Sequence, residues 1–220
     1  MPKKDIVDLT KEFVKEMLSD DKSGHDWWHS ERTLNLARHI AQKEPGANAL
    51  IVELGALLHD IADWKFHNGD ITAGPRAARK WLESQDIDQE ITDSVVYIVE
   101  HISFRGGTNK HVMQTLEGKI VQDADRLDAM GAIGIARTFT FGGTRQRVMY
   151  DPAIEAGQHT SFEEYQKIID KNTTINHFYE KLLLLKDGMH TKTAKELAGH
   201  RHRVMEQFLD EFYKEWHGEL

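Results

Sequence analysis

The sequence predicts an all-α fold, a bundle of helices, on the strength of two observations. Apolar residues recur at helical spacings of three and four along most of the chain, and the first such stripe consists of Ile6, Leu9, Phe13 and Met17. No run alternates apolar and polar residues with the β-branched enrichment that indicates a strand. We therefore expect almost no β-sheet.

The expected helices follow in order along the chain. The first stripe stops at the polar turn SDDKSG, and a second helix begins near His29 and continues through 33–40, where EPGAN ends it. Residues 50–64, LIVELGALLHDIADW, are apolar for too long to form one strand and predict a buried helix. Further helices are expected over residues 72–82, 90–104, 116–139, 161–185 and 190–216. The segment 140–160 is the longest irregular stretch, and it either divides the core from the C-terminal helices or covers a site as a lid.

The composition is that of a soluble globular protein with one domain. The 220 residues are 40% apolar and 29% charged, and no apolar run approaches the roughly 18 residues of a membrane-spanning helix. The net charge of −8 disfavours nucleic-acid binding, which needs a basic face. The absence of cysteine excludes disulfides, Cys-ligated zinc and a cysteine nucleophile. Because the N-terminus lacks the pattern of a secretion signal, the protein is expected to be cytoplasmic.

The segment ALLHDIADWKF places two adjacent polar residues, His59 and Asp60, in an apolar run. Neighbouring residues of a helix point about 100° apart, so burying both side chains is difficult. An aspartate is rarely buried unless it is paired or bound to a metal. A divalent cation would offset the carboxylate charge and accept the neutral imidazole as a second ligand. The weaker alternative is a hydrogen-bonded core histidine beside a helix-capping aspartate.

A second group of carboxylates lies in the run IVQDADRLDAMGAIGIA, where Asp123, Asp125 and Asp128 share an otherwise apolar helix. So many carboxylates on an apolar helix predict that at least one of them faces a cation. The others are expected to pair with Arg126 or Arg137.

Two histidines complete the set of candidates. In GHDWWHSER, His29 shares a helix face with Arg32, although an exposed first turn with Asp26 as a helix cap explains the same pattern. In VEHISFRGG, His101 lies near the end of a helix, where a lone histidine is more often structural than functional.

Four of these residues form a consistent set of metal ligands. The set combines two imidazoles with two carboxylates, from His29, His59, Asp60 and Asp125. It suits a divalent cation such as Mn²⁺, Mg²⁺, Co²⁺, Ni²⁺, Fe²⁺ or Zn²⁺. Four protein ligands on an octahedral ion leave room for a water and a substrate oxygen. Such an ion can lower the pKa of its water and polarise a phosphoryl group.

These residues resemble the pattern H…HD…D that defines the HD-domain superfamily of metal-dependent phosphohydrolases. His29 with Arg32 matches the first histidine in its H-x-x-R context, LLHDI matches the HD pair, and Asp125 in ADRL matches the last aspartate. The wider run GHDWWH…LLHDIADWKF…ISFRGG…QDADRLDAMGAIGIARTF is similar to the small stand-alone bacterial HD hydrolases. The segment HFYEKLLLLKDGMHTKTAK extends this similarity toward the C-terminus.

The resemblance implies a fold, a metal site and a reaction. The fold is an HD-domain helical bundle with additional C-terminal helices, a single domain over 1–220 with its core at about 20–140 and an extension at about 160–217. Metal ligation carries over to the four matching residues; one ion is expected, with His101 and His111 as ligands if there is a second. Some members of the subgroup cleave nucleoside triphosphates to monophosphates and pyrophosphate, so the resemblance implies hydrolysis of (deoxy)nucleoside triphosphates to these products by metal-activated water, with manganese among the candidate ions.

Other functions stay open at this point. A phosphodiesterase or a 5′-nucleotidase could use the same metal site, and a non-catalytic regulatory module could keep the ion for structure alone. The expected partner is a small nucleotide or another phosphate compound, and neither a membrane nor a nucleic acid. The amphipathic C-terminal helices can pack within the chain or across a homodimer.

Catalytic and substrate-binding residues are expected around the ion. Asp63, one turn beyond Asp60, is placed to orient or deprotonate the attacking water, and a corresponding acidic position often follows the HD pair in the nucleotide-hydrolysing branch of the family; a surface carboxylate is the alternative. Lys65 could meet a phosphate oxygen. Further substrate contacts are expected from Arg32, His101, Arg105, Arg145, Arg147 and Lys181.

Two groups of candidate substrate contacts also have a structural explanation. A solvated basic turn accounts for Arg145 and Arg147 as well as phosphate contact does. Aromatic residues near the site either stack on a base or belong to the core, and they are Trp27, Trp28 and Trp64.

Overall fold

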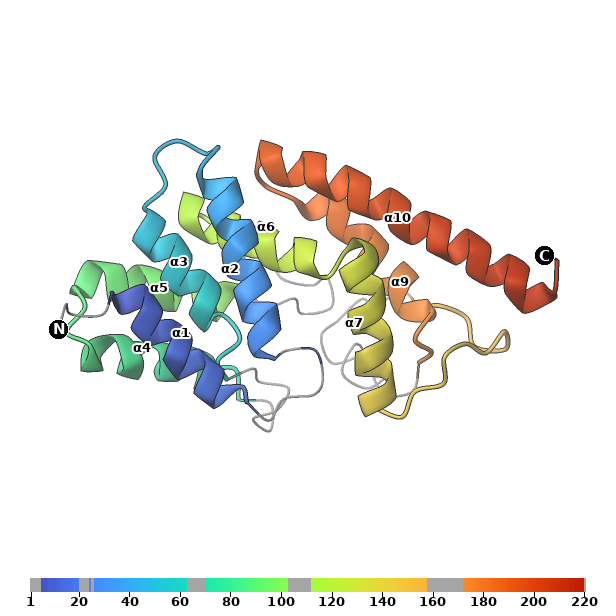
Figure 1. Ribbon diagram of the computed structural model, residues 1–220, viewed down its shortest axis with the longest axis horizontal. Helices are drawn as coiled ribbons and strands as arrows, with labels where there is room; N and C mark the ends of the chain where they lie inside the picture. The colour runs from blue at the N-terminus through green and yellow to red at the C-terminus, as the bar shows by residue number, and fades with distance from the viewer. Residues whose placement is uncertain are drawn as a thin grey trace. The chain divides into compact units, whose positions relative to one another are not determined.

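The described part of the chain consists of helices joined by turns and loops (Figure 1). In this computed structural model the described residues are 5–19, 24, 26–62, 70–102, 112–157 and 172–219. None of these residues belongs to a β-strand, which confirms the predicted all-α fold class. Among the helices described, none is long and apolar enough to cross a membrane.

The helices fall into two compact units. The described residues up to Asp125 form the first unit, with α1 (Ile6–Met17), α2 (Trp27–Ala41), α3 (Ala49–Leu58), α4 (Ala73–Ser84), α5 (Gln89–His101) and most of α6 (Leu116–Asp128). Those from Arg126 onward form the second, with α7 (Gly131–Thr144), α9 (Asn176–Glu180), the 3₁₀-helix η2 (Leu182–Gly188) and α10 (Lys192–His217). The expectation of a single domain over 1–220 stays a prediction.

Helix α3 is a largely buried helix of the first unit, and it packs against α1, α2 and α5. Its buried residues are Val52, Leu54, Gly55, Ala56, Leu57 and Leu58. Gly55 permits close packing, because a Cβ there would lie 3.2 Å from Ile98 Cδ1 on α5 and 3.4 Å from Val121 Cγ2 on α6. Contacts on several sides explain why the sequence of α3 is almost continuously apolar.

Helix α3 ends at Leu58, earlier than the predicted end at residue 64. His59 is the C-cap residue, and residues 60–62 follow in turns. Neighbouring residues of a continuing helix would point about 100° apart, whereas here Asp60 Oδ2 lies 3.6 Å from His59 Nε2. The prediction of a helix was therefore wrong for 59–62, and residues 63–64 lie outside the described part of the chain.

The helix predicted over 116–139 is two helices, α6 and α7. They are separated at Met130, whose backbone is extended with φ −120° and ψ 160°. Gly131 follows with φ +70°, a left-handed conformation that costs glycine little because it has no side chain. Helix α7 then continues to Thr144, so the first part of the segment predicted to be irregular, 140–144, is helical.

Aromatic residues on α10 pack against other elements of the second unit. The ring of Phe208 packs against Phe139 of α7 and Phe178 of α9, with centroids 5.8 and 5.7 Å apart. Near the end of α10, Trp216 meets Tyr150 edge-on with centroids 4.9 Å apart. The aromatic stripe of the C-terminal helix thus packs against elements of its own unit.

The two predicted C-terminal helices differ in how well they match the structure. The helix predicted over 190–216 corresponds to α10, which Thr191 caps by accepting a hydrogen bond from the Ala194 N–H. The helix predicted over 161–185 is not continuous, because Lys181 has non-helical backbone angles (φ −140°, ψ −58°) between α9 and η2. Its first part lies outside the described residues.

Candidate metal centre

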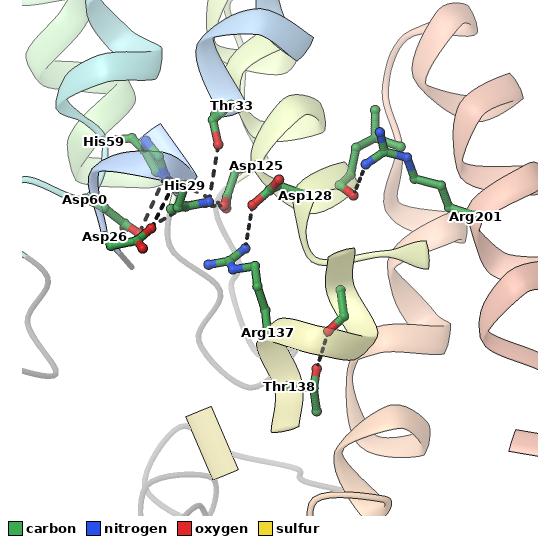
Figure 2. Close-up of polar contacts among 12 residues, drawn as sticks. Asp26, His29, Thr33, His59, Asp60, Asp125, Asp128, Arg137, Thr138 and Arg201 are labelled. Atoms are coloured by element: carbon green, nitrogen blue, oxygen red, sulfur yellow. Dashed lines mark hydrogen bonds and ion pairs between the residues drawn. The ribbon is translucent and has the colours of Figure 1, made fainter. Parts of the chain in front are cut away.

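Three segments of the first unit bring two histidines and two carboxylates together (Figure 2). His29 lies in the first turn of α2, His59 and Asp60 directly follow α3, and Asp125 lies on α6. The Nε2 atoms of the two histidines are 3.0 Å apart. Asp60 Oδ2 lies 3.4 Å from His29 Nε2 and 3.6 Å from His59 Nε2, and Asp125 Oδ1 lies 3.4 and 3.7 Å from the same two nitrogens. We call these four residues the His–Asp cluster.

His29 is fully buried at the start of α2. Asp26 is the N-cap residue of this helix, and its Oδ1 accepts a hydrogen bond of 3.0 Å from the His29 backbone N–H. The sequence allows His29 to be either a site residue or part of an exposed first turn that Asp26 caps, and the second explanation is correct only for the cap. Asp26 is a helix cap, but the histidine it precedes is not on the surface.

The ring of His59 is oriented by the last turn of α3. Its Nδ1 lies 2.8 Å from the carbonyl oxygen of Ala56, and because a carbonyl can only accept, Nδ1 carries a proton. In the neutral ring, Nε2 then has a lone pair that faces His29, Asp60 and Asp125. Metal-binding histidines have this arrangement, with the second ring nitrogen donating to a carbonyl or a carboxylate.

A hydroxyl group lies in the equivalent place beside His29. Thr33, one turn later on α2 and fully buried, has its Oγ1 3.4 Å from His29 Nδ1. Neither Thr33 nor Ala56 stands out in the sequence by residue type. The signal that could have found them is spacing, because residues three or four apart on a helix lie on the same face.

The charges of the cluster shift the pKa values of two of its members. Burial lowers the pKa of His59, but the carboxylates of Asp60 and Asp125 outweigh burial and raise this pKa above its ordinary value of 6.5. Burial raises the pKa of Asp125, but hydrogen bonds to His29 and His59 hold it well below its ordinary value of 3.8. The cluster therefore concentrates negative charge at a point where the imidazoles are fully shielded from water.

The donor atoms of the cluster fit a divalent cation. His29, His59 and Asp125 each offer one ligand atom, and these atoms all lie within 4.8 Å of one another. Imidazole nitrogen combined with carboxylate oxygen is a donor set that several first-row ions share. The tautomer of His59 directs its Nε2 lone pair into the cluster, as binding of a cation requires. His29, His59 and Asp125 thus form a candidate metal site.

Asp128, one turn beyond Asp125 on α6, has a different partner. Arg137 of α7 donates a hydrogen bond of 3.0 Å to its Oδ2, and the two side chains are 2% and 16% exposed. Arg201 of α10 donates to the carbonyl oxygen of Leu127. Burial lowers the pKa of Arg201, and the charge of Asp128 acts in the opposite direction. The prediction that an α6 carboxylate pairs with Arg126 or Arg137 is confirmed for Asp128.

Two further predicted site residues of the first unit are half-buried on their helices. His101 Nδ1 lies 2.9 Å from the carbonyl oxygen of Tyr97, and the two rings have centroids 4.6 Å apart. Among the described residues, His101 is not part of the group of ligand atoms that His29 belongs to. Arg32 lies on α2, three residues after His29. Their roles as substrate contacts stay predictions.

Three predicted substrate contacts belong to the second unit. The Cζ atoms of Arg145 and Arg147 lie 5.5 and 5.2 Å from the ring centroid of Phe141, so both guanidinium groups lie near one aromatic ring. Lys181 is half-buried between α9 and η2. The other predicted positions lie outside the described residues, namely Asp63, Trp64, Lys65, Arg105 and His111.

The two tryptophans that precede His29 have different surroundings. Trp28 is 58% exposed at the start of α2, whereas Trp27 is half-buried. A side chain this exposed contributes little to a core, so the core explanation is wrong for Trp28. Its role as a surface on which a base stacks stays a prediction.

The residues of the His–Asp cluster fall within a known family model. The model, described as HD domain, matches residues 27–130. The chain is also 38% identical over 205 residues to the protein YpgQ of Bacillus subtilis (strain 168), a match that covers 92% of this chain and 90% of that protein.

Solved structures are similar to nearly the whole chain. A crystal structure of a Lactobacillus plantarum protein has a TM-score of 0.84 at 38% identity and covers 99% of this chain and 100% of that one. An HD-superfamily hydrolase from Bacillus thuringiensis has a TM-score of 0.72 at 44% identity, over 96% of each chain. Bacillus subtilis YpgQ in complex with ADP has a TM-score of 0.74 at 36% identity, over 95% of this chain and 97% of that one.

Proposed function

This chain belongs to the HD domain family and is by homology a metal-dependent phosphohydrolase, and on that premise we propose that it acts on nucleotides. The favoured reaction is hydrolysis of (deoxy)nucleoside triphosphates to monophosphates and pyrophosphate. The observation that carries the proposal is the convergence of two imidazoles and two carboxylates in the His–Asp cluster. The complex of the relative YpgQ with ADP supports a nucleotide as the substrate.

The residues of the cluster would hold one divalent cation, with His29, His59, Asp60 and Asp125 as ligands. A bound cation supplies two effects, a lower pKa of water and a polarised phosphoryl group. The imidazoles contribute Nε2 lone pairs, and the Ala56 carbonyl keeps that of His59 directed inward. The two carboxylates offset the double positive charge. Manganese is the first ion to test.

Hydrolysis needs a group that accepts a proton and groups that hold the phosphates. In the proposed reaction the water oxygen bonds to the α-phosphorus, the bond to the bridging oxygen breaks, and pyrophosphate leaves. We assign Asp63 to orienting the water and accepting its proton, and Lys65 to a phosphate oxygen. Arg32, on the same helix as His29, is proposed as a further phosphate contact.

Product analysis tests the reaction. Purified protein would be incubated with each nucleoside triphosphate, deoxynucleoside triphosphate and monophosphate in Mn²⁺, Mg²⁺, Co²⁺ or Ni²⁺, and pyrophosphate and orthophosphate would be measured separately. Pyrophosphate release from triphosphates is the expected result. Orthophosphate from monophosphates would instead identify a 5′-nucleotidase, and cleavage of a generic phosphodiester a phosphodiesterase. Metal binding without any turnover would point to a non-catalytic module.

The role of Asp63 has its own test. Asp63→Asn removes a proton acceptor but keeps the size of the side chain, so the expected variant binds Mn²⁺ like the wild type and turns over more slowly. Titration calorimetry and steady-state rates would be measured on the same preparation. An equal loss of metal binding would contradict the assignment and make Asp63 a structural or ligating group.

A further inference from the structure

The two histidines of the cluster are oriented by different kinds of group. The Nδ1 atom of His59 faces a backbone carbonyl, that of Ala56, at 2.8 Å. The Nδ1 atom of His29 faces a side-chain hydroxyl, that of Thr33, at 3.4 Å. A backbone carbonyl is present whatever the residue, whereas the hydroxyl depends on one residue type. The orientation of His29 is therefore open to a test by substitution.

Thr33 also differs from other threonines on the helices of this chain. Thr10, Thr138 and Thr140 each donate to the carbonyl oxygen four residues earlier, at 2.8, 2.8 and 3.0 Å. The hydroxyl of Thr33 meets the ring of the residue four positions earlier, His29. Both side chains are fully buried, so water does not compete for this contact. The oxygen of Thr33 is thus committed to the imidazole.

The contact bears on which nitrogen of His29 carries the proton. To give a cation its Nε2 lone pair, the neutral ring must carry the proton on Nδ1. The competing tautomer, with the proton on Nε2, could donate to His59 Nε2 at 3.0 Å instead. A hydroxyl beside Nδ1 can accept from the first tautomer or rotate and donate to the second. Without the hydroxyl, the metal-binding tautomer loses the acceptor that Thr33 offers to the buried Nδ1–H, which disfavours this tautomer.

We propose that Thr33 is a positioning residue of the metal centre, whose hydroxyl accepts the Nδ1–H of His29 and so presents the Nε2 lone pair to the cation. The inference rests on the proposed function, because it requires a cation at the His–Asp cluster. At 3.4 Å the contact is longer than a typical hydrogen bond. Its loss is therefore expected to weaken metal binding about tenfold, at the low end of the effects of such supporting residues.

The test compares three variants by Mn²⁺ titration calorimetry. Thr33→Val removes the hydroxyl and keeps the branched shape, Thr33→Ser keeps the hydroxyl, and Thr92→Val is the matched control. Thr92 is fully buried on α5 of the same unit, where its hydroxyl donates to the Ile87 carbonyl at 3.4 Å. We expect Thr33→Val to bind Mn²⁺ about tenfold more weakly, and the serine variant and the control to bind like the wild type. Wild-type affinity in Thr33→Val, or equal weakening in Thr33→Ser, would overturn the proposal.

A spectroscopic measurement on the wild type covers the case in which Thr33→Val does not fold. In protein labelled with ¹⁵N at histidine and loaded with diamagnetic Zn²⁺, His29 should show a protonated Nδ1 and an unprotonated Nε2. A proton on Nε2 in the loaded protein would contradict the proposal. Failure of the proposed function can be told apart from failure of the Thr33 role. In the first case the wild type itself would bind no divalent cation, which would contradict the metal site.

Discussion

Two aspartates one turn apart on α6 have partners of different types, imidazoles for one and a guanidinium for the other. Asp125 faces the imidazoles of His29 and His59, with its Oδ1 3.4 and 3.7 Å from their Nε2 atoms. Asp128 accepts a hydrogen bond of 3.0 Å from the guanidinium of Arg137. Both aspartates lie in the same apolar run of the sequence, and residue type and spacing alone do not distinguish them.

The difference predicts a structural role for Asp128 and a metal-binding role for Asp125. Arginine is charged at every relevant pH, so the Asp128–Arg137 pair is electrically complete within the protein. The His–Asp cluster combines two carboxylates with imidazoles, and these carboxylates raise the pKa of His59 despite its burial. An excess of negative charge beside buried imidazoles is what a divalent cation would balance. The comparison therefore predicts that changes at the two aspartates affect different properties.

The largest expected effect is the loss of activity in Asp125→Asn. This change removes one of the negative charges that hold the cation, and we expect kcat/KM for the best nucleotide substrate to fall by about a thousandfold, or about 4 kcal/mol. The matched control on α6 is Glu117→Gln, because Glu117 Oε1 accepts a hydrogen bond from the Asn48 N–H at 2.9 Å and glutamine retains this oxygen. Loss of less than about tenfold in Asp125→Asn would contradict its role as a ligand.

The next effect concerns stability rather than activity. Arg137→Met removes the guanidinium beside a carboxylate that is only 2% exposed, and we expect the free energy of unfolding to fall by about 3 kcal/mol. Urea unfolding measures this change. Mn²⁺ affinity, determined by calorimetry, is expected to stay at the wild-type value. If Arg137→Met bound Mn²⁺ much more weakly than the wild type, the two aspartates would not have separate roles.

The smallest effect is a dependence of metal binding on pH. A proton and a cation compete for Nε2 of His59, and in the metal-free protein the pKa of this histidine is raised above 6.5. Mn²⁺ affinity should therefore rise with pH until it passes the raised pKa and then level off. Below that pKa, protonation of this one group lowers affinity about tenfold per pH unit. Calorimetry across a pH series measures the profile, and an affinity that is flat from about pH 5 to about pH 8 would contradict it.

Much of the fold follows from the sequence because helical periodicity is a local signal. The apolar stripes predict α1, α2, α4, α5 and α10 close to where they lie. The ends of α3 and α6 were not predictable from periodicity, because apolar residues continue past both helices. Where α3 ends, His59 and Asp60 face His29 and Asp125, which are far away in the sequence, so the local pattern carries no signal of this arrangement.

The candidate site was predictable in its ligand types and less so in its supporting groups. His59, Asp60 and Asp125 stand out because polar residues are conspicuous in apolar surroundings, whereas His29 is identified by its match to the family pattern. Thr33 and the Ala56 carbonyl do not, since a threonine is ordinary in a helix and a backbone carbonyl is invisible in a sequence. The assignment of Asp128 to Arg137 likewise required the structure, because either Arg126 or Arg137 fitted the sequence equally well.

The most direct test of the account is the binding of Mn²⁺ to the wild type and to Asp60→Ala, measured by titration calorimetry with far-UV circular dichroism on the same samples. Asp60 Oδ2 lies against both imidazoles of the cluster, at 3.4 and 3.6 Å. The account predicts one Mn²⁺ per wild-type chain and no measurable binding in the variant, with the helical signal mostly intact. Unchanged affinity and stoichiometry in a folded Asp60→Ala variant would contradict the claim that the His–Asp cluster is the metal centre.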